Sequence, residues 1–303
     1  MLKVRRLNEE HLRKVYKLRD IFFKEHFDFL CLTSQRRVSN IIIARALNND
    51  GGSIPIEFSR QQGKTKIISL TCVFLELYYF SLVKRLKLPH TDFFNIGIFA
   101  PQKEQSKTDF DEIKKALRKL DNCGYNFKFN EFNGNTINFT TEGQKEERKI
   151  FCFSASPSSN TESKTLNIII LEEAQKLIDE VIDNTISPMG AHTNAVKIYI
   201  GTAGYKKCRF LEVIEKTDIK DKIVSDYHNA IKERKELYEK TQNPVFLNYS
   251  KHIEEEKRKL GENSDAFKTQ YALQWILERG QFITYQQLLN LVVKQDPVRL
   301  SHY

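Results

Sequence analysis

Residues 54–65 read Ile54-Pro55-Ile56-Glu57-Phe58-Ser59-Arg60-Gln61-Gln62-Gly63-Lys64-Thr65. The apolar residues at the start predict a short strand, 54–58, and the apolar run after Thr65 predicts a long helix to about Arg85. Backbone N–H groups at such a turn can bind phosphate, Lys64 can reach the β- and γ-phosphates of a nucleotide, and the Thr65 hydroxyl can ligate Mg²⁺. The stretch therefore predicts a phosphate-binding loop, although Gly-Lys-Thr also recurs by chance and Phe58 replaces the first glycine of G-x-x-x-x-G-K-[ST].

Helix and strand patterns alternate on both sides of this loop. Amphipathic spacing predicts helices over 8–27 and 39–47, before the turn at 48–52. Downstream, the sequence predicts strands over 95–100, 150–154, 168–171 and 196–200, helices over 103–120 and 174–183, and a hairpin at Asn133-Gly134. Nearly continuous apolar strands are typical of a parallel sheet that is buried on both faces. We therefore predict an α/β fold with a parallel sheet flanked by helices.

The pattern changes after Gly201, where no strand signal of any strength remains. Helices are predicted over 220–240, 249–260, 264–278 and 285–293. The chain is expected to divide into an N-terminal helical segment (1–50), an α/β core (51–210) and C-terminal helices (211–303). We expect the helices of both chain ends to form one helical subdomain beside the sheet.

Composition narrows the class of protein. The 303 residues are 40% hydrophobic and 29% charged, which excludes a disordered chain, a collagen and a membrane bundle. Lys and Arg outnumber Asp and Glu by 48 to 39, and a net charge of +9 favours polyanionic partners such as nucleic acid. Five widely spaced cysteines without a C-x-x-C pair indicate neither disulfides nor a zinc ribbon, and favour a reducing, cytosolic compartment. The most apolar window, 67–83, carries Glu76 and is interpreted as a buried core helix.

Two further strand ends carry polar groups that suit nucleotide chemistry. The strand 168–171 is followed by Glu172 and Glu173, of which one can hold a metal and the next can orient water. The alternative is an ordinary strand followed by a solvated helix start, where acidic residues are favoured. The strand ending at Ile200 is followed by Gly201 and Thr202, whose hydroxyl could lie near a γ-phosphate; the alternative is a plain strand-to-loop turn.

The order and spacing of these segments, over roughly 35–282, resemble the ATPase domain of the viral or phage terminase large subunit, the motor that packages DNA into capsids. The resemblance rests on the segments 59–65, 168–173 and 200–202, with weaker support from 99–101, 133–137, 267–271 and Trp275. It implies a P-loop NTPase fold of the ASCE type, in which the N-terminal segment belongs to a lid on the adenine side. The loop would be a divergent Walker A motif and the acidic strand a Walker B motif.

The resemblance also implies roles for individual residues. Lys64 and Thr65 would bind phosphate and Mg²⁺, Glu172 would be the metal-associated acid where the family normally has Asp, and Glu173 would activate water. Thr202 would couple hydrolysis to domain motion. Arg60 would sense or stabilise the γ-phosphate; the alternative is a salt-bridged surface arginine. The loop residues assigned to nucleotide binding are Ser59, Arg60, Gln61, Gln62, Gly63, Lys64 and Thr65.

Gln35 lies in a stretch, 32–37, that resembles the adenine-reading glutamine region of such ATPases. A Gln amide can pair with both N6 and N7 of adenine, and a polar residue at a helix start is an equal alternative. If the enzyme works as a ring, an arginine finger supplied in trans is also needed. The sequence does not single it out: Lys164, Arg148 and Arg209 are the candidates.

Other patterns favour structural interpretations. Phe267, Tyr271 and Trp275 lie at helical spacing and predict core packing more than a base-stacking platform. The basic clusters could contact DNA phosphates, although each is more often a solvated face; they are Lys114-Lys115, Lys206-Lys207 and Lys257-Arg258-Lys259.

The resemblance implies Mg²⁺-dependent ATP hydrolysis that powers translocation of double-stranded DNA into a capsid. The implied partners are double-stranded DNA, further copies in a ring, a portal and a small terminase subunit, with no membrane, in the cytoplasm of an infected or lysogenic host cell. Full-length relatives continue into a nuclease domain; we expect an isolated ATPase domain or a shortened homologue without nuclease activity. The alternatives are a helicase-like translocase and a non-enzymatic DNA-docking or assembly subunit, the latter suggested by Glu172 and Phe58 standing where Asp and Gly are usual.

Overall fold

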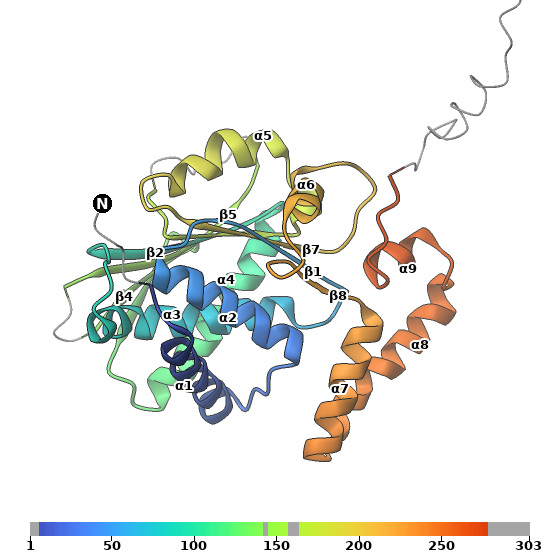
Figure 1. Cartoon of the computed structure of the whole chain (residues 1–303), viewed down its shortest axis with the longest axis horizontal. Coiled ribbons are helices and arrows are strands. Elements are labelled where there is room, and N and C mark those ends of the chain that lie inside the picture. Colours follow the sequence, from blue (N-terminus) through green and yellow to red (C-terminus); the bar gives the residue numbers. More distant parts are fainter. Residues whose placement is uncertain (1–5, 142–144, 157–163, 278–303) are drawn as a thin grey trace, which may run out of the picture.

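The computed structural model describes residues 6–141, 145–156 and 164–277, and these residues surround one eight-stranded sheet (Figure 1). In spatial order the strands are β3 (Lys128–Phe132), β4 (Thr136–Thr140), β5 (Glu147–Ser154), β2 (Phe93–Ala100), β6 (Ile168–Glu172), β7 (Val196–Gly201), β1 (Gly52–Phe58) and β8 (Ile223–Ser225). From β5 to β8 all neighbours are parallel, and β3 and β4 add an antiparallel hairpin at one edge. The hairpin turn uses Asn133 and Gly134, with φ of 52° and 65°. The predicted α/β class is confirmed.

The strand register brings the ends of β1, β6 and β7 together. Glu57 pairs with Gly201, and Ile200 pairs with Glu172, so the three strands end at nearly the same level. The loop after β1, the acids at the end of β6 and the turn after β7 therefore lie at one edge of the sheet. Ligands of open parallel sheets bind at this carboxyl edge.

Helices cover both faces of the sheet. In Figure 1, α1 (Glu9–Phe27), α2 (Thr33–Asn48), α3 (Lys64–Leu86) and α4 (Lys103–Asn122) lie below the sheet, and α5 (Asp179–Val181) and α6 (Arg209–Lys216) lie above it. Helix α3 has the length and apolarity of a membrane span, but 78% of its most apolar window is buried inside the protein. This placement confirms the interpretation of 67–83 as a core helix.

The two chain ends contribute to different cores, which corrects the expectation of one subdomain built from both. Helix α1 joins the main core through Phe22, whose ring lies 5.7 Å from Phe74 and 5.5 Å from Tyr78. The C-terminal helices α7 (Tyr227–Thr241), α8 (Asn248–Leu260) and α9 (Asp265–Gln270) form a separate cluster beside β8 (Figure 1). The ends meet where the Ser34 hydroxyl and backbone N–H of α2 donate to Glu233 of α7.

Several predicted boundaries were wrong. Strand β8 occupies 223–225, where a helix was predicted, because these residues pair with β1 and the side chain of Asp226 then accepts from Asn229 N to start α7. The sequence analysis missed helix α6 (Arg209–Lys216). The range 174–183, predicted as one helix, is instead a series of short 3₁₀, α and π turns that continues to Gly190. Helix α9 ends at Gln270, short of the predicted 278, and the predicted helix 285–293 lies outside the described residues.

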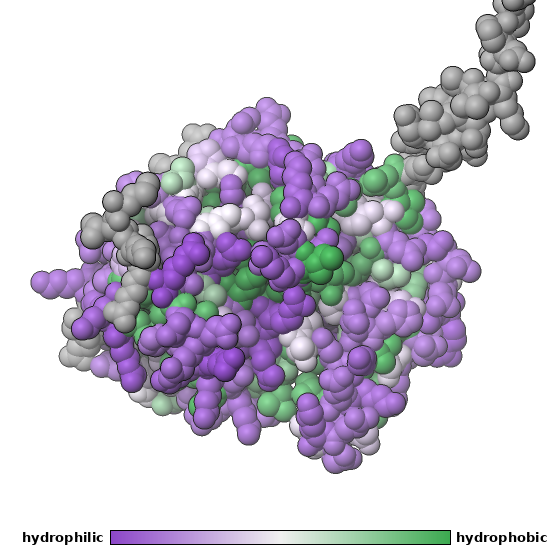
Figure 2. All heavy atoms as spheres, in the orientation of Figure 1, coloured by the Kyte–Doolittle hydropathy of each residue, from purple (hydrophilic) through white to green (hydrophobic). Residues whose placement is uncertain are grey.

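The outer faces of the helical layers are polar. Figure 2 shows charged and polar residues over most of the face seen in Figure 1, with hydrophobic residues gathered in a band at the level of the sheet. The five cysteines are free thiols, as expected for a chain without disulfides.

The segment after α9 returns to the sheet through Trp275. Its indole N–H donates to Glu57 Oε1 over 2.8 Å, and Ile276 N donates to Gly204 O over 3.1 Å. Glu57 is 4% exposed on β1, the strand next to the edge strand β8. Burial raises the pKa of its carboxyl to about 7, against the opposing effects of Trp275 and Lys222. The C-terminal segment is thus attached to β1 through a buried acid.

Phe22→Ala should destabilise the protein by about 3–5 kcal/mol, because it removes a buried ring that contacts α3. Ile21→Ala, one position along the same helix and 41% exposed, should cost about 0.5 kcal/mol. Urea unfolding monitored by circular dichroism measures both. Equal losses would contradict the packing of α1 on the main core.

Because of Glu57, the free energy of unfolding should fall as pH rises. Its folded pKa of about 7 lies above the ordinary value of 4.5, so the folded state holds the proton more tightly and stability is lost between these two pH values. Glu57→Gln should remove up to about 3 kcal/mol of this loss. The free energy of unfolding of both proteins tests this when it is measured from about pH 3.5 to about pH 8, one unit beyond the two values. Parallel curves would refute it.

Candidate functional site

The loop between β1 and α3 is shaped like a phosphate-binding turn. Strand β1 extends through Phe58, which pairs with Ser225, and Ser59 N donates to Ser225 O over 3.0 Å. Phe58 is therefore extended backbone that needs no glycine, and β8 accounts for the departure from the usual motif. The turn follows, with Gln61 at φ 60° and Gly63 at φ 79° immediately before α3.

Side chains of the loop itself fix its shape. Gln62 is buried, and its Nε2 donates to Ser225 O over 2.6 Å and Asp226 O over 2.9 Å, and also to the Ser59 hydroxyl. Lys64 Nζ donates to Phe58 O over 3.1 Å and Ser59 O over 3.4 Å, so its ammonium lies over the turn. Burial lowers the pKa of Lys64, while Glu173 and Glu172 oppose this shift.

Gln35 supports the loop from α2. Its Nε2 donates to Gln62 O over 2.7 Å, its Oε1 accepts from Leu32 N over 3.0 Å, and the residue is 4% exposed. A side chain on Gly63 would place its Cβ 2.9 Å from Gln35 Nε2, so the glycine permits this close approach. The structure thus shows the helix-start role, because Gln35 caps the first turn of α2; adenine recognition stays a prediction.

Glu172 is a buried carboxylate at the end of β6. It is 6% exposed, and its Oε1 has no hydrogen-bond partner within the described residues. Burial raises the pKa of Glu172, and the charge of Asp109 is the second cause of the rise, while Lys64 opposes it. A buried acid with a free oxygen is a suitable ligand for a cation, and its burial excludes the alternative of a solvated helix start.

Asp109 of α4 was missed by the sequence analysis. It is 4% exposed, and burial raises its pKa to about 7 although the Thr65 hydroxyl, its hydrogen-bond partner, opposes the rise. Ser106, Asp109 and Ile113 share the buried stripe of α4. A charged residue on an apolar helix face was the signal that could have revealed it.

Glu173 leaves the strand in a left-handed conformation, with φ 48°. This conformation is uncommon for a side chain other than Gly, Asn or Asp, and here it precedes the 3₁₀ turn at Ala174. Lys176 pairs with Glu173 Oε2 over 2.9 Å, and Gln175 Nε2 donates to the same oxygen over 3.0 Å. Burial raises the pKa of Glu173, but Lys176, Lys64 and Gln175 outweigh burial and hold it below the ordinary value.

Gln175 connects the acid of β6 with the turn after β7. Its Nε2 also donates to the Thr202 hydroxyl over 3.1 Å, and Thr202 is 7% exposed. Gly201 permits this contact, because a Cβ there would lie 2.1 Å from Gln175 Oε1. Thr202 is therefore part of a hydrogen-bonded chain to Glu173, and Gln175 is a second residue that the sequence analysis missed.

A cavity of about 600 Å³ lies beside some of these groups. It is lined by Arg60 from the loop, Glu173, Gln175 and Lys176 after β6, Gln105 from α4, residues 202–206 after β7, and Thr269 and Gln270 from α9. Arg60 is exposed and forms no ion pair within 4.0 Å in the described part of the chain, so the salt-bridged alternative does not hold there. Lys206 of the basic cluster Lys206-Lys207 also lines this cavity.

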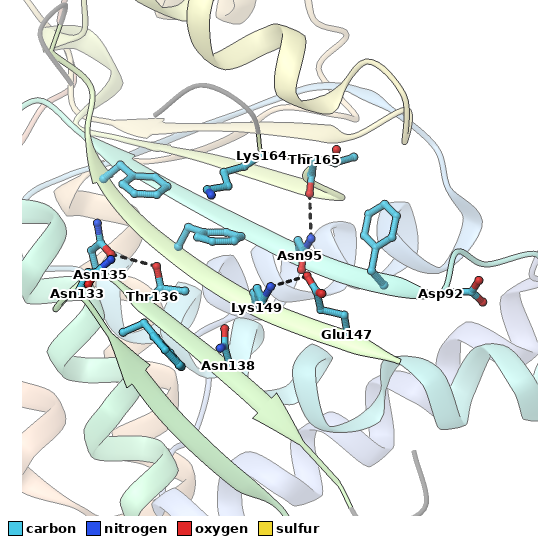
Figure 3. A pocket seen from close by; sticks show the side chains of 14 residues that line it. Asp92, Asn95, Asn133, Asn135, Thr136, Asn138, Glu147, Lys149, Lys164 and Thr165 are labelled. Carbon is cyan, nitrogen blue, oxygen red and sulfur yellow. Dashed lines mark hydrogen bonds and ion pairs between the residues drawn. The ribbon is translucent and has the colours of Figure 1, made fainter. Parts of the chain in front are cut away.

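A larger cavity of about 920 Å³ lies on a different part of the sheet, over β2, β4 and β5 (Figure 3). Asn95 Nδ2 donates to Thr165 O over 3.0 Å there, and Lys149 pairs with Glu147 over 2.7 Å. Residues 59–65, Glu172 and Glu173 do not line it. The smaller cavity is therefore the candidate site.

The three candidates for an arginine finger supplied in trans lie in different surroundings. Arg148 is 2% exposed and donates to Glu76 O over 2.6 Å, so it cannot reach a neighbouring molecule. Arg209 is held by Asp183 and Glu212. Lys164 lines the larger cavity, over the ring of Phe151.

Remaining predictions concern the other basic and aromatic clusters. Lys114 pairs with Asp111 and Glu131, and Lys257 pairs with Glu262, so acids of the same surface already hold both ammonium groups. Phe267 and Tyr271 stack at 5.1 Å in the core of the C-terminal helices, which confirms core packing for these two rings.

The described residues contain no group of three or more His, Cys, Asp or Glu side chains that could hold a metal alone. A divalent ion would therefore take few ligands from the protein and the rest from phosphate and water, as Mg²⁺ does with nucleotides. The unpartnered Oε1 of Glu172 and the Thr65 hydroxyl fit that arrangement.

No protein-family model matches the chain, and no curated protein matches its sequence. Solved structures do match its fold. The chain is similar to the ATPase domain of the large terminase of Thermus phage P74-26, at 14% identity and a TM-score of 0.61, over 84% of this chain and 97% of that one. It is also similar to the large terminase of a thermophilic bacteriophage in complex with ADP, at 17% identity and a TM-score of 0.55, over 81% of this chain and 54% of that one. The shared fold is the one that the sequence predicted.

For a nucleotide bound at this loop, Gln35→Ala should lower the affinity for ATP and for GTP by the same factor, about three- to tenfold, because it removes a support of the loop that both would share. Calorimetric titration with each nucleotide measures this. Ser39→Ala, a buried polar change farther along α2, is the matched control. A loss confined to ATP would instead establish adenine recognition.

Proposed function

We propose that the chain binds ATP in this cavity and hydrolyses it with Mg²⁺, as the ATPase of a DNA-packaging motor. The main support is that Arg60 and Glu173 line one cavity beside the phosphate loop, with Lys64 reaching over the loop. The fold shared with terminase ATPase domains agrees with this proposal, and one of the two neighbours described above is a complex with ADP.

The loop residues would bind the phosphates. The first N–H groups of α3 have no partner within the helix ladder and can donate to phosphate, and the ammonium of Lys64 would move from the carbonyls of Phe58 and Ser59 to the phosphates. The Thr65 hydroxyl and Glu172 would hold Mg²⁺, which neutralises phosphate charge. Asp109, beside Thr65, adds a second buried acid to this region.

Glu173 would act as the base. Its lowered pKa keeps it ionised at neutral pH, and Gln175 and Lys176 hold the carboxylate at the cavity wall. An ionised carboxylate there can orient a water molecule and accept its proton as the water oxygen bonds to the γ-phosphorus. The bond from this phosphorus to the β,γ-bridging oxygen breaks in the same reaction, and ADP is the leaving group. The hydrogen bonds from Gln175 to Glu173 and to Thr202 would carry the change in the site to the turn after β7.

Translocation of double-stranded DNA is the finer part of the proposal. The net charge of +9 favours a polyanionic partner such as DNA. The resemblance to packaging motors favours translocation over a non-enzymatic subunit. A ring of copies with a portal and a small terminase subunit would be the working assembly. Unwinding of a forked duplex by the protein would favour the helicase-like alternative.

Lys64→Ala and Glu173→Ala should each lower Mg²⁺-dependent ATP turnover by about 100-fold or more, because they remove phosphate binding and proton transfer. Lys66→Ala and Glu180→Ala, which remove neighbouring charges that do not line the cavity, are the matched controls. Phosphate release, with and without double-stranded DNA, measures the effect. Full turnover in Glu173→Ala would contradict the assignment, and stimulation by DNA would support the motor.

A further inference from the structure

Arg60 is held by a residue that lies 210 positions away in sequence. Its Nη1 donates to Gln270 Oε1 over 2.6 Å, and its backbone N donates to Gln270 O over 2.9 Å. The carbonyl of Arg60 accepts from the Tyr249 hydroxyl over 3.1 Å. Both backbone polar groups and the guanidinium of Arg60 are therefore bonded to the C-terminal helices.

Gln270 is itself fixed in place. It ends α9, whose Phe267 is buried in the C-terminal core, and the neighbouring Thr269 hydroxyl donates to Tyr205 over 3.2 Å. A few residues later, Trp275 donates to the buried Glu57. The chain is thus held in place both before and after Gln270, and Gln270 lines the cavity that contains Glu173.

The chemical type of this acceptor matters. A carboxylate in the same place would pair with the guanidinium and neutralise it, whereas an amide oxygen accepts the hydrogen bond and leaves the positive charge unmatched. Within the described ranges no carboxylate lies within ion-pair distance of Arg60. The arginine is therefore oriented toward the cavity with its charge available.

We propose that Gln270 is a positioning residue that orients Arg60 without neutralising it, so that the guanidinium can pair with the terminal phosphate of a bound nucleoside triphosphate. This inference rests on the proposed nucleotide site. It gives α9 a role in distinguishing triphosphate from diphosphate, because only the triphosphate carries the group that Arg60 would meet.

The test compares the affinities for ATPγS and ADP in the presence of Mg²⁺, measured by calorimetry on the whole chain. Gln270→Glu has the same shape and still accepts from Arg60, but it should lower the preference for ATPγS over ADP by about three- to tenfold and leave ADP affinity unchanged. Arg60→Ala should lower the same ratio at least as much. Gln274→Glu, an exposed change of the same charge four residues later, should keep the wild-type ratio.

The outcomes separate this inference from the proposed function. A wild-type ratio in Gln270→Glu, with its melting temperature unchanged, would overturn the positioning role, since a purely structural acceptor tolerates this substitution. An equal fall of the ratio in Gln274→Glu would also overturn it, because the effect would then be nonspecific charge. Failure of the wild-type protein to bind either nucleotide would overturn both proposals.

Discussion

The placement of β1 between β7 and β8 is the constraint on which the rest of the structure depends. Pairing with β7 brings the end of β1 level with Glu172 and Thr202, and pairing with β8 extends the strand through Phe58. The turn therefore begins at Ser59, and its left-handed residues are Gln61 and, immediately before α3, Gly63. Without β8, the backbone of Phe58 would lack its strand partner. Gln62 would also lose two hydrogen-bond acceptors, the carbonyls of Ser225 and Asp226.

Three glutamines hold the loop, each from a different direction. Gln62 ties it to the end of β8, Gln35 supports it from α2, and Gln270 holds Arg60 from α9. Amide groups form hydrogen bonds with backbone groups and with donors without adding charge. Carboxylates in these places would neutralise nearby cations, which a phosphate ligand would require. The positive potential of the loop is thereby kept while its shape is fixed.

Acidic side chains gather at the same edge of the sheet. Glu172 and Asp109 are both buried, and burial raises the pKa of each; Asp109 adds to the rise at Glu172, and Glu173 adds to the rise at Asp109. Buried like charges destabilise a fold unless a cation or a proton compensates them. Glu173, at the cavity wall and held by Lys176, stays ionised instead. The pKa values of these neighbouring acids are therefore shifted in opposite directions, because their surroundings differ.

The sequence by itself determined the elements whose signals are local. Apolar runs and turn residues predicted β1, α3, β6, β7 and the hairpin, and they placed Lys64, Thr65, Glu172, Glu173 and Thr202 at strand ends. Tertiary structure alone decided the short strand β8, the separation of the two chain ends into different cores, and the contacts of Asp109, Gln175 and Gln270. Strand β8 has three residues, too few for a periodic pattern, and it forms because β1 offers backbone partners. The contact between Arg60 and Gln270 spans 210 positions, and local periodicity carries no information about which distant side chains will meet.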